Sequence, residues 1–300
     1  MPKMSPIRIF HTLWTKPLRE DRIPVTLLCY AISLHYARQM GAEVVLHTDK
    51  FGAELLALLP YDEVCIDLDA IPEDIKRFWA YGKLFATQRE PLGSVHIDGD
   101  VFLRDRSLER LFRTDADLVT QSEEGGEWRT DYTYELSQAA INIEQLPNNV
   151  GLYYPLSYNC GVVQLNNREL KDRYLDTYFR TVEMSLADSS YEEREKMIKA
   201  KFGDRGSIIP DIVTEQQFLH ELAQNYNTKT ILTGDVRVDG IRKGYTHLCT
   251  AAKYEMQNEI EALLQQINPD LLKKIKKHKY YKPYSKNENV LGSYTKQVAR

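Results

Sequence analysis

The first hundred residues alternate between short apolar segments and longer amphipathic ones, and no other feature of the sequence restricts the fold as strongly. Four segments have the continuously apolar, β-branched character of buried strands, and the first three are each followed by a segment with helical periodicity. The expected strands are 7–13, 43–47, 63–68 and 94–97, and the expected helices are 24–40, 51–59 and 72–89. This alternation is typical of a parallel sheet covered by helices. The sequence therefore predicts an α/β fold with a doubly wound, mostly parallel sheet flanked by helices.

The later part of the chain continues the alternation less regularly. Strand-like segments are expected at 117–121, 158–165 and 230–232, and helical ones at 169–186, 189–201, 210–223 and 256–267. No internal repeat or low-complexity linker interrupts the sequence. We therefore expect one α/β domain over residues 1–268, followed by a tail over residues 269–300 that forms a basic helix and arm.

Composition limits the class of protein further. Hydrophobic residues make up 43% and charged residues 27% of the 300 residues, which is typical of a globular protein and excludes disordered, collagen-like and disulfide-stapled chains. No apolar run approaches the ~20 residues of a membrane span, and the first residues do not resemble a secretory leader. Four cysteines without a Cys-x-x-Cys pattern are expected to be free thiols in a reducing compartment. These features together predict a soluble, cytoplasmic protein.

The tail carries a charge opposite to that of the rest of the chain. The net charge is −4, yet residues 271–300 hold nine Lys or Arg and a single acid, so that the remaining part is strongly acidic. Leu271, Leu272 and Ile275 form an apolar edge at helical spacing among five lysines. Two uses fit this pattern: packing on the acidic body, or weak peripheral association with an anionic membrane. The acidic body argues against nucleic acid as a partner.

The most informative segment follows the fourth expected strand, where Asp98 and Asp100 flank Gly99. In an extended chain, residues two apart face the same side, and ligands of open α/β sheets bind at the carboxyl ends of the strands. Paired carboxylates there suit Mn²⁺ or Mg²⁺, and Gly99 has no side chain to keep a ligand away from the backbone. His11 and Thr12, at the end of the first strand, lie where a nucleotide would bind in such a sheet.

Two other interpretations of the acidic pair are weaker. An Asp-Gly pair is common in hairpin turns, but the flanking chain favours a crossover. An EF-hand calcium loop needs Asp or Asn at its fifth position and Gly at its sixth, where this chain has Phe102 and Leu103. A site for Mn²⁺ or Mg²⁺ is the interpretation that we prefer.

Several segments, in the same order along the chain, resemble the metal-dependent GT-A glycosyltransferases, most closely the branch of glycogenin and the bacterial galactosyltransferases. Besides the acidic pair, they are Lys83-Leu84, Tyr158-Asn-Cys-Gly-Val162, Glu215-Gln-Gln-Phe-Leu219 and His247-Leu-Cys-Thr-Ala-Ala-Lys253. The resemblance covers about residues 7–255. It implies a GT-A-like, Rossmann-type fold and the transfer of a sugar from a nucleotide diphosphate sugar, with UDP expected as the nucleotide, to an acceptor that the sequence does not identify.

The resemblance also implies roles for individual residues. The metal ligands would be Asp98, Asp100 and His247, and the residue on the diphosphate would be Lys253. The donor side would be lined by Lys83, Asn159 and Gly161, and the catalytic positions beside the sugar would be Glu215 and Gln216. Two positions depart from the family pattern, because Thr250 stands where Gly is usual and Glu215 where Asp is usual. Retention of the anomeric configuration is implied as well.

Three functions remain open from the sequence. The first is the metal-dependent glycosyltransferase. The second is another metal-dependent enzyme acting on nucleotides, such as a nucleotidyltransferase, which usually has a Gly-rich basic loop after its first strand; residues 11–17 contain no glycine. The third is a non-catalytic protein that binds a nucleotide sugar. Titration of UDP with and without Mn²⁺ is the measurement that best separates the first function from the others.

Overall fold

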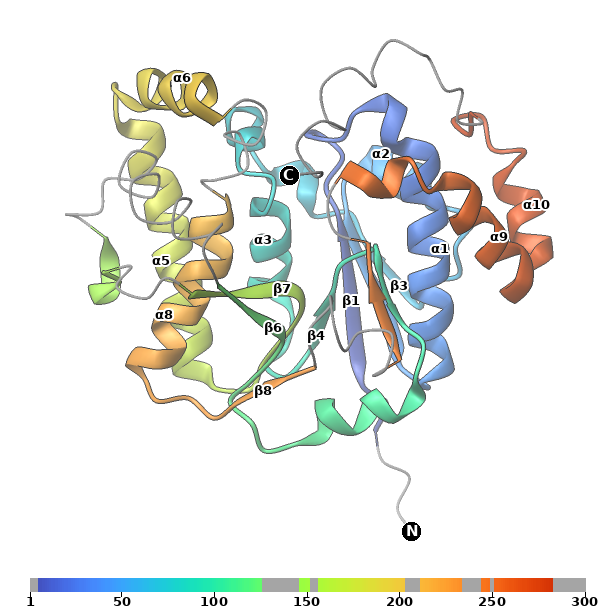
Figure 1. Cartoon of the computed structure of the whole chain (residues 1–300), viewed down its shortest axis with the longest axis horizontal. Helices are drawn as coiled ribbons and strands as arrows, with labels where there is room; N and C mark the ends of the chain where they lie inside the picture. The colour runs from blue at the N-terminus through green and yellow to red at the C-terminus, as the bar shows by residue number, and fades with distance from the viewer. Residues whose placement is uncertain are drawn as a thin grey trace, which may run out of the picture.

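The computed structural model describes residues 5–125, 146–151, 156–202, 211–233, 244–248 and 251–282. A central sheet runs through the molecule, and helices cover both of its faces (Figure 1). The helices on one face are α1 (Ile23–Gln39), α9 (Gln257–Ile267) and α10 (Pro269–Ile275). Those on the other face are α3 (Tyr81–Arg89), α5 (Arg168–Ala187) and α8 (Phe218–Asn225).

The main sheet has seven strands in the described residues, in the order β3-β2-β1-β4-β7-β6-β8. Their bounds are β1 Arg8–Leu13, β2 Glu43–Thr48, β3 Glu63–Cys65, β4 Val95–Ile97, β6 Leu118–Gly125, β7 Leu156–Leu165 and β8 Thr230–Leu232. The first four strands of this order are parallel, β7 is antiparallel to both of its neighbours, and β8 is parallel to β6. The predicted α/β fold with a mostly parallel sheet flanked by helices is confirmed.

A second, two-stranded sheet begins shortly after the end of β4. It consists of β5 (Val101–Leu103) and β9 (Tyr245–His247), which are antiparallel. Since β4 and β5 belong to different sheets, the three residues between them do not form a hairpin turn, as the flanking sequence predicted. These three residues are the acidic pair and its glycine, which therefore lie between the two sheets.

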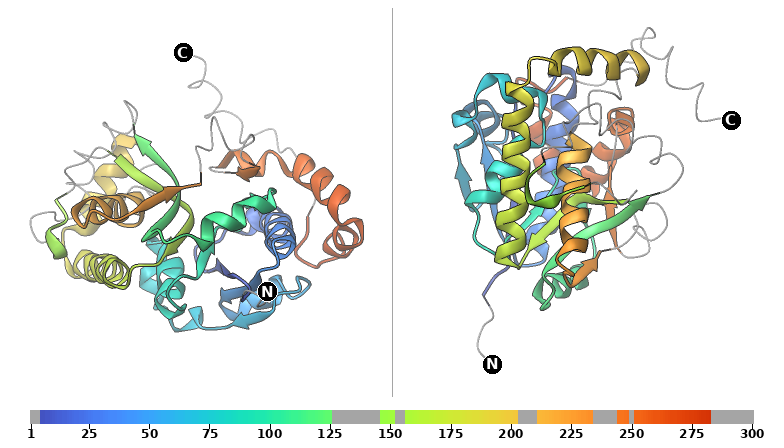
Figure 2. Two further views of the ribbon diagram at one scale, coloured as in Figure 1. Left: turned by 90° about the horizontal axis from the view of Figure 1, so that it is seen from below. Right: turned by 90° about the vertical axis from the view of Figure 1, so that its left-hand side faces the viewer.

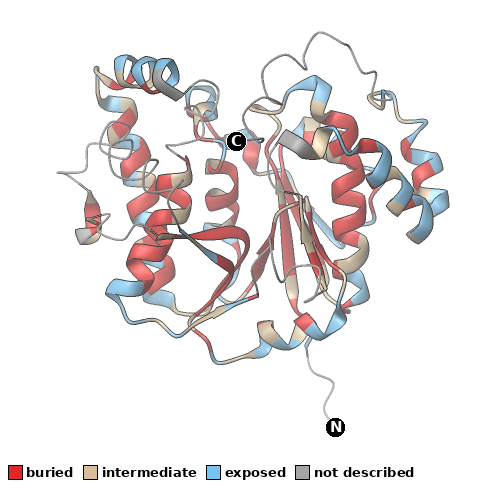
Figure 3. Ribbon diagram, viewed as in Figure 1, coloured by how far each residue is buried: buried red, intermediate tan, exposed pale blue. Residues whose placement is uncertain are grey.

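Two apolar layers, one on each face of the main sheet, hold the fold together. One joins α1 to β1, β2, β5, α9 and α10, and the other joins β7 to α3, α5 and α8. The buried residues lie along the strands and on the sides of the helices that face them (Figure 3). The left view of Figure 2 shows α9 and α10, in orange and red, packed outside α1, in blue. Val44, Val45 and Leu46 of β2 are at most 1% exposed, because both faces of that strand are covered.

One expected helix, 72–89, is broken in the structure. A 3₁₀ turn (Glu73–Arg77) comes first, and α3 begins only at Tyr81. The fully buried carboxylate of Asp211 accepts hydrogen bonds from the backbone N–H groups of Trp79 and Ala80, each at 3.2 Å. Local periodicity does not reveal this break because the acceptor comes from a distant part of the chain. The expected helix 210–223 likewise starts with a π-helical segment, η8 (Ile212–Gln217), before α8.

The start of the basic tail packs on the body of the protein. Leu272 and Ile275 of α10 are 3% and 0% exposed and belong to the layer around α1. Lys276 Nζ lies 2.6 Å from Glu261 Oε2, and Lys279 pairs with Glu54. This part of the tail therefore has the packing role that its apolar edge and charge predict. Residues 283–300 lie outside the described residues, and both the tail as a separate unit and its membrane association stay predictions.

Two further expectations, on membrane spans and on cysteines, can be compared with the described residues. None of the helices in the described part of the chain is long and apolar enough to cross a membrane. Cys29, Cys65 and Cys160 are free thiols, as expected; Cys29 and Cys160 are buried, whereas Cys65 is only half-buried. Cys249 lies outside the described residues.

Candidate functional site

The two aspartates stand at a turn that backbone hydrogen bonds fix on both sides. Asp98 follows β4, and its N–H donates to the carbonyl oxygen of Gly161 on β7 at 2.8 Å. The N–H of Val101 donates to the carbonyl oxygen of Asp98 at 2.9 Å and closes the turn. The N–H of Leu248 donates to the carbonyl oxygen of Asp100 at 3.0 Å. The acidic pair is therefore held between β7 and the end of β9.

His247 joins the two aspartates because β9 pairs with β5. In this pairing His247 lies opposite Val101, next to Asp100 in the chain. Its Nε2 is 3.6 Å from Asp100 Oδ1. One ligand atom each from Asp98, Asp100 and His247 lie within 4.8 Å of one another. Carboxylate and imidazole ligands suit Mn²⁺, and carboxylates with water suit Mg²⁺, so these three side chains fit the cation that the resemblance implies.

Lys83 connects the acidic pair to a second buried carboxylate. Its Nζ lies 2.8 Å from Asp98 Oδ1 and 2.6 Å from Glu215 Oε1. It also donates to the carbonyl oxygen of Cys160 at 3.1 Å. Burial alone would lower the pKa of this ammonium, but the two carboxylates outweigh burial and raise the pKa above its ordinary value. Lys83 is therefore a buried, charged group directly beside the candidate metal site.

Lys253 pairs with the second aspartate of the site, as Lys83 pairs with the first. Its ammonium forms an ion pair with Asp100 Oδ2. Burial lowers the pKa of Lys253, but the carboxylate of Asp100 raises it by more, so that the side chain is a cation. Each aspartate of the pair thus has one lysine on it, and both lysines are among the residues that the resemblance implies.

Glu215 lies deep behind Lys83. It belongs to the π-helical segment η8, is 1% exposed, and its backbone carbonyl accepts the hydroxyl proton of Tyr174 at 2.8 Å. Burial raises the pKa of the Glu215 carboxyl, while the neighbouring Lys83 lowers it. Such a carboxylate positions Lys83 rather than facing solvent. Gln216, the next residue, is half-buried.

The structure explains Gly99 by packing within the protein. A methyl group at this position would lie 2.1 Å from Cε2 of the Tyr30 ring, so that only glycine fits there. The Tyr30 hydroxyl in turn donates to the backbone carbonyl of Thr12. From the sequence we expected a ligand to make the close approach at Gly99, whereas in the structure the aromatic ring makes that approach.

His11 and Thr12, expected on the nucleotide side, differ in their surroundings. His11 is fully buried, and its ring nitrogens lie 2.9 Å from the Tyr61 hydroxyl and 3.1 Å from the Ser33 hydroxyl. Burial lowers the pKa of His11 to about 4, so the ring is neutral. Thr12 is half-buried, and its hydroxyl has no hydrogen-bond partner within the described ranges. Of the two, only Thr12 has a side-chain atom left for a ligand.

Asn159 and Gly161 lie on β7, beside the acidic pair. The amide nitrogen of Asn159 donates to Glu124 Oε1 at 2.7 Å, and its amide oxygen accepts from the backbone N–H of Gly161 at 3.0 Å. A methyl group on Gly161 would lie 2.4 Å from Gln121 Oε1 and 2.6 Å from His247 Cε1. Gly161 is therefore required for the close approach of His247 to the strand.

Sequence reasoning missed three residues around this site. The first is Asp211, which fixes the start of α3, and the second is Gln121, which lies against Gly161. The third is Trp79, which is 39% exposed and whose ring centroid lies 6.0 Å from Lys83 Nζ. Gln121 stands among polar residues in the strand segment Leu118–Gly125 (LVTQSEEG), so its burial could not be read from the local sequence.

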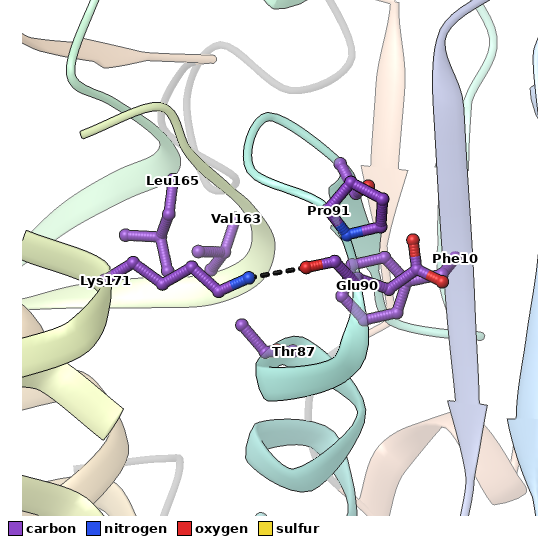
Figure 4. Close-up of a pocket in the computed structure, with 8 residues that line it drawn as sticks. Phe10, Thr87, Glu90, Pro91, Val163, Leu165 and Lys171 are labelled. Carbon is purple, nitrogen blue, oxygen red and sulfur yellow. Dashed lines mark hydrogen bonds between the residues drawn. The ribbon is translucent and has the colours of Figure 1, made fainter. Parts of the chain in front are cut away.

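A small pocket lies at the opposite end of β4 and does not compete with this site. Its volume is about 10 Å³, roughly the space that one water molecule needs. Figure 4 shows Lys171 reaching across it to the backbone carbonyl oxygen of Glu90, at 2.6 Å. The pocket is too small for a nucleotide or a sugar, so the site around the acidic pair is the stronger candidate.

Residues 7–278 match the model of a family of unknown function (DUF6734). A comparison with curated proteins found no match. The match to the family model covers most of the chain, including every candidate site residue named above.

Solved structures with a similar fold include three glycosyltransferases. GlyE of Streptococcus pneumoniae TIGR4 is 11% identical over 89% of this chain and 63% of its own, with a TM-score of 0.39. Galactosyltransferase LgtC, solved with donor and acceptor sugar analogs, is 16% identical over 85% and 95%, with a TM-score of 0.37. Mouse xyloside xylosyltransferase 1 is 13% identical over 94% and 96%, with a TM-score of 0.38. The chain also spans 52% of the bifunctional glycosyltransferase WbbM. TM-scores this low do not reveal an activity, so the function has to be inferred from the residues of the site.

Proposed function

The chain belongs to the DUF6734 family, and we propose that it is a glycosyltransferase that moves a sugar from a nucleotide diphosphate sugar, with UDP as the nucleotide, to an acceptor hydroxyl. One observation carries this proposal. Asp98, Asp100 and His247 offer ligand atoms within 4.8 Å of one another, and a lysine sits on each aspartate. A divalent cation with two ammonium groups beside it is what a diphosphate leaving group requires.

The lysines and aspartates of the site can exchange partners when the donor binds. Lys83 and Lys253 now neutralise Asp98 and Asp100. A cation held by Asp98, Asp100 and His247 would stabilise the negative charge that develops on the departing diphosphate. The two lysines would then turn from the carboxylates to the phosphate oxygens, where an ammonium acts as a compact point charge. Glu215 stays with Lys83 and keeps it in place.

This exchange predicts that cation and diphosphate bind together. Without a ligand, the aspartates are already paired with the two lysines, so a cation alone gains little and must displace an ammonium group. A diphosphate alone meets two lysines that are already paired. A bound cation releases the lysines from the aspartates, and a bound diphosphate draws the lysines away and so releases the aspartates. By thermodynamic linkage, each ligand raises the affinity of the protein for the other by the same factor. Mn²⁺ should therefore bind UDP-loaded protein at least about tenfold more tightly than the free protein.

In the proposed reaction, the bond between the sugar C1 and the diphosphate oxygen breaks, and the electron pair leaves with UDP. A bond from C1 to the acceptor oxygen forms, and the proton of the acceptor hydroxyl passes to the departing diphosphate oxygen. We propose retention of the anomeric configuration, with the half-buried Gln216 on the side of the sugar and the buried Glu215 acting there through Lys83. The exposed ring of Trp79, close to Lys83, offers a flat apolar surface on which a sugar ring can pack.

Calorimetric titration of UDP with and without Mn²⁺ tests the metal site. Asp98→Asn and Asp100→Asn should each weaken the Mn²⁺-dependent binding of UDP by about 100-fold or more, because a hard cation loses a charged ligand. Asp105→Asn is a matched control, since Asp105 is a nearby aspartate that caps a 3₁₀ helix through Ser107, a function that Asn also performs. Equal binding of UDP·Mn²⁺ by Asp100→Asn and the unmodified protein would contradict the metal assignment.

The reaction products distinguish a glycosyltransferase from a nucleotidyltransferase and from a non-catalytic binding protein. Incubation with a panel of UDP-sugars and Mn²⁺ should release UDP and a glycoside or, with water as acceptor, a free sugar. Release of pyrophosphate from UTP and a sugar 1-phosphate would instead indicate a nucleotidyltransferase. Tight, Mn²⁺-dependent binding with no turnover of any UDP-sugar would indicate a non-catalytic binding protein.

A further inference from the structure

Gln121 is a fully buried polar residue whose side chain has no partner among the described residues. It lies within β6, is 0% exposed, and neither its Oε1 nor its Nε2 has a hydrogen bond there. Leaving a buried amide unpaired costs about 1–3 kcal/mol for each group. A native fold keeps such a residue when a ligand, an ion or a moving side chain completes its hydrogen bonds.

The position of Gln121 indicates which group completes them. A methyl group built on Gly161 would lie 2.4 Å from Gln121 Oε1 and 2.7 Å from His247 Nδ1. The amide oxygen of Gln121, on β6, and the ring nitrogen of His247, on β9, therefore both point toward the position that a Cβ of residue 161 would occupy. His247 Nδ1 is itself buried and has no hydrogen-bond partner in the part of the chain that the structure describes. Two unpaired, complementary polar atoms thus border the same space beside Gly161, without a hydrogen bond between them in the structure.

The chemistry of a histidine ligand assigns their roles. Nε2 of His247 faces Asp100 and the candidate metal site, at 3.6 Å from Oδ1. A histidine that binds a cation through Nε2 keeps its proton on Nδ1 and donates it to an acceptor outside the metal shell. The amide nitrogen of a glutamine is a donor only, so the amide oxygen must face the ring.

We propose that Gln121 is a positioning residue of the metal site, whose amide oxygen accepts a hydrogen bond from Nδ1 of His247 and so fixes the tautomer and ring orientation that present Nε2 to the cation. This inference rests on the metal site of the proposed function. It also explains why Gly161 carries no side chain, because any Cβ would separate the two groups.

Substitution of Gln121 tests the proposal through metal affinity, without any need for turnover. Gln121→Met keeps the length of the side chain and removes the acceptor, and Gln121→Glu keeps an acceptor oxygen. Mn²⁺ affinity is measured in the presence of saturating UDP from the paramagnetic resonance signal of free Mn²⁺. We expect Gln121→Met to weaken Mn²⁺ binding by about 10–100-fold and Gln121→Glu to restore most of it. Thermal melts of both variants should stay within a few degrees of the unmodified protein.

A double-mutant cycle shows whether the effect passes through His247. In a His247→Ala background, the added change Gln121→Met should weaken Mn²⁺ binding no further, since the residue that it positions is gone. The ¹⁵N spectrum of the histidine rings with Mg²⁺ and UDP bound should show His247 protonated at Nδ1, and Gln121→Met should change that signal.

Gln164 provides the matched control. It is a glutamine of β7 that is 3% exposed, and its amide nitrogen donates to the carbonyl oxygens of Gly93 and Phe112. Gln164→Met should lower the melting temperature and leave Mn²⁺ affinity unchanged. If the unmodified protein binds Mn²⁺ but Gln121→Met binds it equally well, or if the loss persists in the His247→Ala background, the positioning role is refuted. If the unmodified protein binds no Mn²⁺, the proposed function itself fails.

Discussion

Two groups of buried charges differ in how completely their hydrogen bonds are formed: one joins Glu90 to β1 and β2, and the other lies beyond the carboxyl end of β4. The structural cluster consists of Arg8, His47 and Glu90. Both ring nitrogens of His47 are paired, with Asp67 at 2.9 Å and with Glu90 at 2.9 Å. Arg8 forms a bidentate pair with Glu90, at 2.7 and 3.0 Å. No ring nitrogen of His47 and no carboxylate oxygen of Glu90 is left without a partner.

The candidate site has the same kinds of residue but leaves several polar atoms unpaired. Within the described residues, these include atoms of Thr12, Gln121 and His247. A buried polar network whose bonds are all made stabilises a single structure, whereas one with missing partners destabilises the fold until a ligand supplies them. Apart from Oδ1 of Asp67, which also has no partner among the described residues, the structural cluster has its hydrogen bonds made, and this rather than the presence of buried charge separates it from the candidate site.

The largest effect is expected from removing the central residue of the structural cluster. His47→Ala leaves Glu90 and Asp67 without a shared cation in a site where the Glu90 side chain is 3% exposed. Breaking a buried ion pair from one side costs about 3–5 kcal/mol. Chemical denaturation should show a loss of this size, while binding of UDP·Mn²⁺ to the folded fraction should be unchanged. If His47→Ala is as stable as the unmodified protein, the cluster around His47 does not have the structural role that sets it apart from the candidate site.

The pH dependence of stability should follow from the same cluster. Burial alone would lower the pKa of His47, but the hydrogen bonds that its ring donates to the carboxylates of Asp67 and Glu90 raise the pKa from 6.5 to about 9. His47 therefore stabilises the fold fully below about pH 6.5, and this contribution is lost as the pH rises through 9. Burial alone would raise the pKa of Glu90, but His47 and Arg8 lower it from 4.5 to about 2.

Glu90 thus contributes above about pH 4.5, and this contribution is lost as the pH falls to 2. Stability should be highest between about pH 4.5 and 6.5 and fall by about 3 kcal/mol on either side. Unfolding free energies measured from pH 2 to 9.5 check this prediction. His47→Ala should have no alkaline decline of that size; an equal decline in both proteins would mean that other groups cause it.

Gly161→Ala should weaken the candidate site without touching the structural cluster. The added methyl group would lie 2.4–2.7 Å from atoms of Gln121 and His247, so that both side chains must move. We expect Mn²⁺ affinity in the presence of UDP to fall about 100-fold, by the loss of a positioned ligand. Gly93→Ala is a useful comparison, because that glycine has a positive φ (86°) and lies far from the acidic pair. It should lower stability and leave Mn²⁺ affinity as it is.

The smallest effect is expected from Lys253→Ala. If Lys253 turns from Asp100 to a phosphate oxygen, its removal should weaken binding of UDP about tenfold and leave binding of uridine unchanged. Calorimetry with both ligands in the presence of Mn²⁺ makes the comparison. Equal losses for uridine and UDP would exclude Lys253 from the diphosphate side.

The strands and most helices could be predicted because their apolar periodicity is local. The acidic pair could be placed at a strand end for the same reason. Interactions between distant residues could not be predicted. Asp211, which breaks the expected helix at Trp79, is 132 residues away from it in sequence. Likewise, the need for glycine at position 99 comes from the Tyr30 ring, and the role of Gln121 depends on a histidine of another sheet.

The candidate ligands of the site come from parts of the chain that are far apart, and this has a consequence for biosynthesis. Lys253 and Asp100, which form an ion pair, are 153 residues apart, and His247 reaches the site only through the pairing of β9 with β5. Closing so large a loop is an entropic cost that must be met before the contact forms. A nascent chain would therefore hold its aspartates for most of its translation without their partners. Under the proposed function, the capacity to bind a nucleotide with its cation would appear only after synthesis has passed Lys253.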